Sequence, residues 1–328
     1  MRTADFDYSL PPELIAQTPA AARDASRLLV LDRSTRQFAH RQFSSLPDYL
    51  RAGDLLVLNN SRVIPARLRA RKAITGSAIE VLLAEEVAAN DWRALLRPGK
   101  RVRTGTVLEF PQSIRATVLE KSEEGLYRLR FEGTPDILQS AEQFGEIPLP
   151  PYITRDQAPG ADDRERYQTV YAGPKGSVAA PTAGLHFTPR LLETLRARGV
   201  DSAQVTLHVG LGTFAPVKAE SLEGHRMHSE RFEISEGAAA KIQAAKRAGG
   251  RVVAAGTTSL RVLESVAAQR GTIEAASGRT SLFVYPPCRF RAVDALLTNF
   301  HLPQSTLLML VSAFASPGME DGRDWILQ

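Results

Sequence analysis

The stretch RVVAAGTTSLRVLESVAAQ, residues 251–269, decides the fold class of this 328-residue chain. The short apolar run Arg251–Ala255 is typical of a buried strand, and Leu260–Gln269 has the length of a helix. Gly256 and the hydroxyl residues after it lie where the strand would turn into the helix. A strand that passes directly into a helix in this way indicates an α/β sheet.

The turn Gly256-Thr257-Thr258-Ser259 has two interpretations. Backbone N–H groups and hydroxyls at a helix N-terminus can bind a carboxylate or a phosphate. The same residues can also cap a helix with no ligand bound. The turn matches neither a Walker loop nor the G-x-G-x-x-G fingerprint, so nucleoside triphosphates and NAD are not indicated.

The rest of the chain shows two kinds of hydrophobic pattern. Apolar runs suited to buried strands continue the α/β pattern on both sides of residues 63–150. These runs are Leu28–Leu31, Leu55–Leu58, Val205–Val209, Leu282–Tyr285 and Val293–Leu297. Between residues 63 and 150, short β-like runs alternate with glycine and proline turn signals, as in a small antiparallel barrel. We therefore predict an α/β main domain, residues 1–62 plus 151–328, with an inserted small antiparallel β-barrel-like domain at residues 63–150.

The segment YAGPKGSVAAPTAGLHFT, Tyr171–Thr188, contains too many glycines and prolines for a regular element, which predicts a loop with a fixed path. Thr188 and Pro189 then open a helix as its N-cap and first residue. A loop that delivers His186 to the start of a helix suits a small anionic or nucleotide-like ligand. The other interpretation is a well-packed loop in which His186 is a hydrogen-bonded core residue.

Two polar clusters follow predicted strands directly. Asn59-Asn60-Ser61-Arg62 follows the run Leu55–Leu58, and Thr298-Asn299-Phe300-His301 follows Val293–Leu297. Ligands of open α/β sheets bind at the carboxyl ends of strands. Asn299 and His301 therefore either face a pocket or bond to backbone within a tight connection.

Composition excludes several classes of protein. The net charge of +5 and the sequence pI of about 9.5 favour an acidic partner such as RNA without requiring one. Cys288 is the only cysteine, which excludes an internal disulfide and a cysteine-rich zinc site. His225 and His228 are three residues apart, but Gly224 argues against a helix there, and we expect no metal. No apolar run has the length of a membrane span and no signal-peptide pattern is present, so we expect a cytoplasmic protein.

Motifs along nearly the whole chain resemble one known family. They are Phe6–Gln17 (FDYSLPPELIAQ), Gly53–Arg67 (GDLLVLNNSRVIPAR), Glu165–Ala172 (ERYQTVYA), Tyr171–Thr188, Leu207–Phe214 (LHVGLGTF), Gly256–Glu264 (GTTSLRVLE) and Thr298–Phe314 (TNFHLPQSTLLMLVSAF). In this order they resemble the S-adenosylmethionine:tRNA ribosyltransferase-isomerase family of queuosine biosynthesis. One departure is that the sequence stops at Gln328, where such proteins usually continue to an aromatic-rich end.

The resemblance implies an enzyme that acts on tRNA. It would transfer the ribosyl part of S-adenosylmethionine to the 7-aminomethyl group of a 7-deazaguanine base at the wobble position, and isomerise it to an epoxycyclopentanediol. Adenine and methionine would leave, S-adenosylmethionine would be a co-substrate, and no bound cofactor is implied. Because the sulfonium acidifies the neighbouring C5′ carbon, a base must remove a proton, and an acid should protonate the departing adenine.

The resemblance also directs the choice of candidate residues. His186 and His301 are the candidate acid and base residues. Phe187 and Phe214 are expected to stack on adenine or on the modified base. The full set of expected substrate contacts is Asn59, Asn60, Arg62, Thr182, Phe187, Phe214, Thr257, Thr258, Ser259, Arg261 and Asn299. Arg67, Arg69 and Arg71 are the expected tRNA contacts, although such a row can also be a solvated strand face.

Two other classes of function stay open at this point. One is a non-catalytic RNA-binding protein with an α/β core and a barrel module, which would release no adenine or methionine from S-adenosylmethionine. The other is a metal-dependent hydrolase that uses the histidines, which would contain stoichiometric metal. We expect a monomer that does not associate with membranes.

Overall fold

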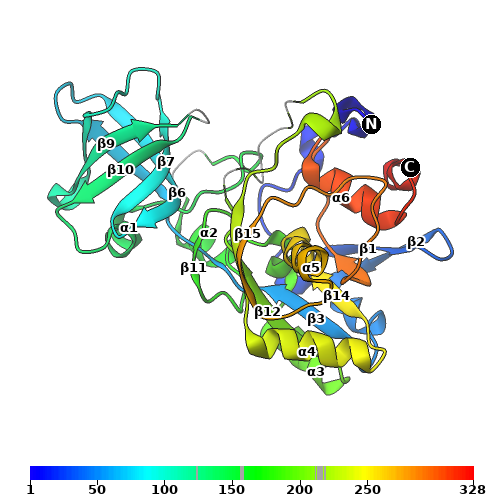
Figure 1. Ribbon diagram of the computed structural model, residues 1–328. Coiled ribbons are helices and arrows are strands. Elements are labelled where there is room, and N and C mark those ends of the chain that lie inside the picture. Colours follow the sequence, from blue (N-terminus) through cyan, green and yellow to red (C-terminus); the bar gives the residue numbers. More distant parts are fainter. Residues whose placement is uncertain (123–124, 156–158, 211, 213–216, 218) are drawn as a thin grey trace. The chain divides into compact units, whose positions relative to one another are not determined.

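The computed structural model describes residues 1–122, 125–155, 159–210, 212, 217 and 219–328, and it divides into two compact units (Figure 1). The main unit comprises residues 1–61, 168–174 and 180–328, and the barrel unit comprises residues 62–167 and 175–179. The domain limits expected from the sequence, after residues 62 and 150, stay a prediction.

The main unit is built on a six-stranded mixed sheet with the strand order β15-β13-β12-β3-β14-β16. Strands β12, β3, β14 and β16 run parallel, whereas β13 and β15 pair antiparallel at one edge. Their bounds are β3 Leu55–Asn59, β12 Asp201–Leu207, β13 Glu230–Ile234, β14 Val252–Ala255, β15 Ala276–Thr280 and β16 Ala295–Leu297. An antiparallel hairpin, β1 Arg27–Asp32 and β2 Gln37–Gln42, extends from this unit (Figure 1). The predicted α/β main domain is confirmed.

Helices cover the sheet of the main unit. Their bounds are α3 Pro189–Ala197, α4 Glu236–Arg247, α5 Thr257–Arg270, α6 Thr306–Ala315 and α7 Gly322–Leu327. Short 3-10 segments add Thr3–Phe6, Pro12–Leu14, Arg23–Ala25, Phe43–Asp48, Thr182–His186 and Leu222–Gly224. The hydroxyls of Thr188, Ser235 and Ser305 accept backbone N–H groups as N-caps of α3, α4 and α6. Helix α5 is buried from Thr257 to Ala267, because it packs directly against the central strands.

Strand β3 is fully buried and ends in Asn59, whose side-chain amide forms hydrogen bonds to backbone groups as a peptide group would. Asn59 is 0% exposed. Its Nδ2 donates to the carbonyl of Leu207 at 3.1 Å, and its Oδ1 accepts from the backbone N–H groups of Leu207 and Ser61, each at 3.1 Å. The amide therefore continues the β3–β12 pairing by one step beyond the register that ends at Val205↔Asn59.

The barrel unit is a closed antiparallel barrel with the strand order β10-β7-β6-β5-β8-β9. Its strands are β5 Arg67–Lys72, β6 Ala78–Ala88, β7 Asp91–Arg97, β8 Val107–Glu109, β9 Arg115–Lys121 and β10 Tyr127–Glu132. The unit also contains β4 Arg62–Val63 and β11 Lys175–Ser177, which pair in parallel, the 3-10 segment Pro111–Ser113 and the helices α1 Ile137–Phe144 and α2 Ala161–Arg166. The predicted small antiparallel barrel is confirmed.

One predicted strand is wrong. The run Leu282–Tyr285 is irregular in the structure, and the edge strand is instead β15, immediately before it. The hydroxyl of Thr280 accepts the N–H of Leu282 at 3.1 Å, which turns the chain out of the sheet. Phe283 and Tyr285 then pack against a cluster that contains Phe6. Their burial in a loop explains the apolar run, because a buried run alone does not distinguish a strand from a packed loop.

The buried amide of Asn59 gives a prediction about stability. Asn59→Ala would remove the three hydrogen bonds that the Asn59 side chain forms with Leu207 and Ser61. Each such bond contributes about 1 kcal/mol, so we expect a loss of at least about 2 kcal/mol in the free energy of unfolding. Urea unfolding followed by circular dichroism measures it. Asn60→Ala is the matched control, because the side chain of Asn60 bonds to the side chains of Gln204 and Thr206 and not to the backbone of a neighbouring strand. Equal stability of both variants would contradict the role of Asn59.

Candidate active site

The predicted motif loops leave the main sheet at neighbouring points of one edge. Strands β3, β14 and β16 are parallel and in register, with Ala255 opposite both Leu58 and Leu297. The N–H of Gly256 donates to the carbonyl of Leu297 at 2.7 Å, which joins the first residues of two of these loops. The carboxyl edge of parallel strands is the usual ligand site of an open α/β sheet.

The loop before α3 reaches the same edge. Gly256 has φ +96°, and a Cβ placed on it would lie 3.2 Å from Thr258 Oγ1 and 3.9 Å from the Cβ of Ala183. Ala183 belongs to the 3-10 segment Thr182–His186. Glycine at 256 thus permits both the left-handed turn and the close approach of this segment.

A hydrogen bond connects the two loops that carry the candidate histidines. Asn299 Nδ2 lies 3.0 Å from His186 Nε2. Because an amide nitrogen only donates, the imidazole nitrogen accepts, and His186 is neutral in this arrangement. Burial lowers the pKa of His186, and this outweighs the opposing effect of a hydrogen bond with the backbone of Arg23. His186 therefore carries an acceptor lone pair at neutral pH.

His301 is held in a second hydrogen bond within the same connection. Its Nε2 lies 3.0 Å from Thr298 Oγ1, and its carbonyl accepts from the hydroxyl of Tyr8 at 2.6 Å. Burial lowers the pKa of His301 to about 4. His301 is therefore neutral at pH 7, and it is a weaker base than an ordinary histidine.

Several buried polar atoms at this edge have no hydrogen-bond partner. They are Thr258 Oγ1, Asn299 Oδ1, Tyr171 Oη and Thr169 Oγ1. A buried donor or acceptor left unpaired costs about 1–3 kcal/mol, so four of them in neighbouring segments are expensive without a ligand. Thr169 and Tyr171 were not among the expected site residues, although both lie in the motif ERYQTVYA.

The other residues that follow Gly256 are bonded within the protein. Ser259 Oγ donates to the carbonyl of Ala255 at 2.9 Å, and Thr257 is buried at the first position of α5. Arg261 is 3% exposed, forms an ion pair with Glu230, and donates from Nε to the carbonyl of Leu282 at 3.1 Å. Only its Nη2 is buried without a partner.

The remaining predicted contacts are dispersed. Asn59 is used inside the sheet, as described above, and Phe187 is 0% exposed with its ring 5.2 Å from that of Phe43. Thr182 is half-buried in the 3-10 segment. Arg62 belongs to the barrel unit. Phe214 lies outside the described residues.

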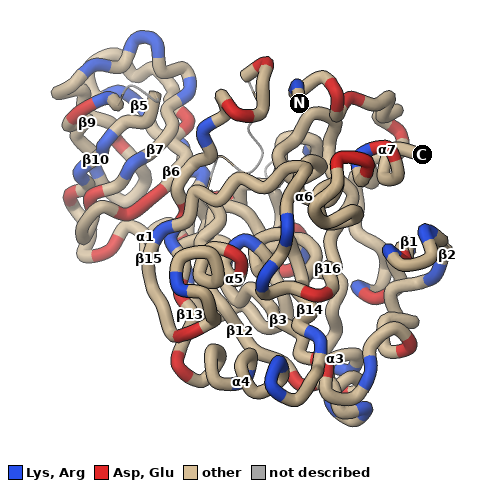
Figure 2. The backbone as a smooth tube through the Cα atoms, turned by 45° about the vertical axis from the view of Figure 1, so that its right-hand side comes forward, with Lys and Arg blue, Asp and Glu red and all other residues tan. Residues whose placement is uncertain are grey.

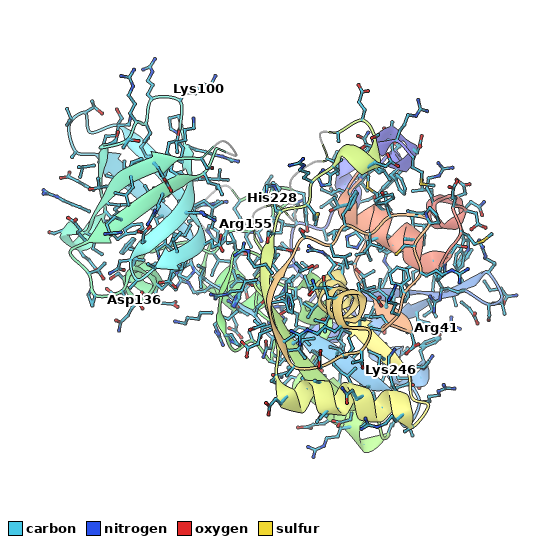
Figure 3. All side chains as sticks on the ribbon, viewed as in Figure 1. Arg41, Lys100, Asp136, Arg155, His228 and Lys246 are labelled. Atoms are coloured by element: carbon cyan, nitrogen blue, oxygen red, sulfur yellow. The ribbon has the colours of Figure 1, made fainter. Side chains whose placement is uncertain are left out.

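The predicted tRNA-binding arginines lie on one strand of the barrel. In β5, Arg67, Arg69 and Arg71 alternate with the buried residues Leu68 and Ala70, which directs them away from the barrel core. Basic positions also follow other strands and loops of this unit, mixed with acidic ones (Figure 2). Side chains such as Lys100 extend outward from it (Figure 3).

Arg69 and Arg71 already have partners within the barrel unit. Arg69 forms two hydrogen bonds to Glu146, at 2.7 and 3.2 Å, and Arg71 donates to the carbonyl of Gly76. Elsewhere, among the described residues, no group of three or more His, Cys, Asp or Glu side chains could hold a metal ion. Within that same part of the chain, no helix is both long and apolar enough to span a membrane.

Comparison with known proteins gives concordant matches over the whole length. The family model described as queuosine biosynthesis protein matches residues 3–322. The chain is 50% identical to the S-adenosylmethionine:tRNA ribosyltransferase-isomerase of Acetivibrio thermocellus, over 100% of this chain and 94% of that protein. It is 53% identical to the protein of the same name from Citrifermentans bemidjiense, over 96% of this chain and 92% of that protein.

A solved structure is also similar. It is the crystal structure of the S-adenosylmethionine tRNA ribosyltransferase of Thermotoga maritima, with 40% sequence identity and a TM-score of 0.53. The match covers 98% of this chain and 92% of that one.

Proposed function

This chain belongs to the queuosine biosynthesis protein family, and from that membership we propose that it is an S-adenosylmethionine:tRNA ribosyltransferase-isomerase. The observation that carries this conclusion is the family match from residue 3 to residue 322. The relatives are named as enzymes of this activity, so a non-catalytic RNA-binding protein is not favoured. S-adenosylmethionine is the co-substrate and tRNA the acceptor, and a metal-dependent hydrolase has no support.

The finer reaction is the one that the family resemblance implies. The amine of 7-aminomethyl-7-deazaguanine attacks the ribosyl group, a C5′ proton leaves next to the sulfonium, and the sugar closes to an epoxycyclopentanediol as adenine and methionine depart. Because its tRNA substrate is in the cytoplasm, we expect the enzyme to be there as well. A monomer stays a prediction.

His186 is the residue that we rank first as the base that removes the C5′ proton. Its lowered pKa keeps it neutral at pH 7, and its Nε2 lone pair is directed at Asn299, an amide that a substrate can displace. His301 is ranked second because its Nε2 is bonded to Thr298 and its pKa of about 4 makes it a weak acceptor. Neutral histidines also suit this reaction, because the amine that attacks must be neutral as well.

Arg261 is proposed as a contact to the methionine carboxylate through its unpaired Nη2. Its ion pair with Glu230 already balances the guanidinium charge, so this contact would be weaker than that of a free arginine. Thr257, Thr258, Ser259 and Asn299 stay proposed substrate contacts, of which Thr258 and Asn299 have unpaired oxygens. For Asn59 and Phe187, the sheet and core contacts described above favour structural roles.

The first prediction for the reaction concerns the histidines. We expect His186→Ala to lower kcat by about 10²–10⁴, the usual effect of losing a general base. The measurement is release of adenine and methionine from S-adenosylmethionine in the presence of tRNA that carries 7-aminomethyl-7-deazaguanine. His40→Ala is the control, because His40 is exposed on β2, and it should react normally. If wild type releases neither product, the proposed function is wrong; if folded His186→Ala turns over normally, only the choice of base is wrong.

The second prediction concerns the row of arginines on β5. The logarithm of the tRNA binding constant falls with the logarithm of the salt concentration, and each phosphate contact adds about 0.7–0.9 to the steepness of this fall. Replacing Arg67, Arg69 and Arg71 by Ala should therefore make the fall less steep by about 2. Affinity for S-adenosylmethionine should be nearly unchanged. Filter binding at several salt concentrations measures the slope. The control replaces Arg93 on β7 and Arg115 on β9, which are ion-paired as Arg69 is but lie on other strands of the barrel. An unchanged slope in the triple variant would move the tRNA contact away from β5.

A further inference from the structure

The hydroxyl of Tyr171 is fixed in place by the residues around it. The Tyr171 ring packs edge-on against Phe187, with centroids 6.4 Å apart. Gly184 lies close to the same side chain, because any Cβ added there would collide with the Tyr171 hydroxyl and would lie 2.8 Å from the methyl of Thr169. Glycine at 184 therefore lets the phenol approach the backbone of the segment that ends at His186.

This fixed hydroxyl is buried without a partner. Tyr171 Oη and Thr169 Oγ1 are both inaccessible to solvent and neither forms a hydrogen bond. Thr169 is 6% exposed. Burial raises the pKa of Tyr171, so the phenol is neutral and both donates and accepts. Two unpaired hydroxyls held this rigidly have the features of a preorganised binding group.

The chemistry of the pair selects one part of the substrate. Neutral hydroxyls pair well with other neutral hydroxyls, whereas a carboxylate or phosphate is best bound by cations or by several N–H groups. The ribosyl group of S-adenosylmethionine carries a vicinal diol, and the product retains a diol. Two further unpaired oxygens belong to Thr258, in the first turn of α5, and to Asn299, in the loop after β16. Gly256 lies close to both Thr258 and Ala183 of the same segment.

We propose that Tyr171 and Thr169 bind the ribosyl hydroxyls of S-adenosylmethionine, with Gly184 providing the space for the Tyr171 hydroxyl. This inference rests on the proposed function and names residues for its co-substrate. Since the hydroxyls are present in substrate, transition state and product, the contact stabilises all three alike. It should therefore change KM for S-adenosylmethionine much more than kcat.

Tyr171→Phe tests the proposal because it removes only the hydroxyl. We expect KM and the calorimetric Kd for S-adenosylmethionine to rise about 5- to 150-fold, the effect of leaving a buried substrate hydroxyl unpaired. The KM for tRNA should be unchanged. Thermal stability should be equal or higher, because the variant removes an unpaired buried polar atom. Gly184→Ala, which displaces the hydroxyl, should weaken S-adenosylmethionine binding in the same direction.

Tyr127→Phe is the matched control. The buried Tyr127 hydroxyl donates to the carbonyl of Gly99 at 2.7 Å, so its loss should lower stability and leave S-adenosylmethionine binding intact. A Tyr171→Phe variant that behaves like this control would overturn the proposal. So would unchanged affinity for S-adenosylmethionine, or an equal loss of affinity for its 2′,3′-dideoxy analogue. Wild-type turnover is measured in parallel, so that a failure of the proposed function is seen separately from a failure of this contact.

Discussion

The buried strand β3 is the constraint on which the main unit depends. It pairs in parallel with β12 on one side and β14 on the other, and all five of its residues are buried. Asn59 extends this pairing past the end of the strand by bonding to both backbone groups of Leu207. The loops that carry Gly256 and Asn299 leave the sheet beside this strand, so their mutual positions follow from its register.

The candidate site is polar, and three of its titratable side chains are uncharged. Burial lowers the pKa of His186 and of His301, and raises that of Tyr171, so each of these groups is neutral at pH 7. The buried cation Arg261 is balanced by Glu230. Such a site suits a substrate that brings its own positive charge, the sulfonium, because neutral acceptors can take a proton from the adjacent carbon without first losing one.

Sequence patterns predicted the α/β sheet and the barrel because both depend on local signals: apolar runs, glycine turns and the strand-to-helix passage at 251–269. They were less informative where contacts form between residues far apart in the sequence. Leu282–Tyr285 has the composition of a strand but packs in a loop against Phe6. Asn59 was expected at a ligand, and only the structure shows that its amide also bonds to Leu207, 148 residues away on β12. Tyr171 was passed over because only the fold shows that its hydroxyl lacks a partner.

The most direct test of the account follows the ribosyl carbons. S-adenosylmethionine labelled with one isotope in the ribosyl carbons and another in the methyl group is incubated with the enzyme and tRNA that carries 7-aminomethyl-7-deazaguanine. Mass spectrometry of the digested tRNA then shows which label was transferred. The account predicts that the ribosyl label enters the modified nucleoside while the methyl label leaves with methionine. Transfer of the methyl label, or of neither, would contradict it.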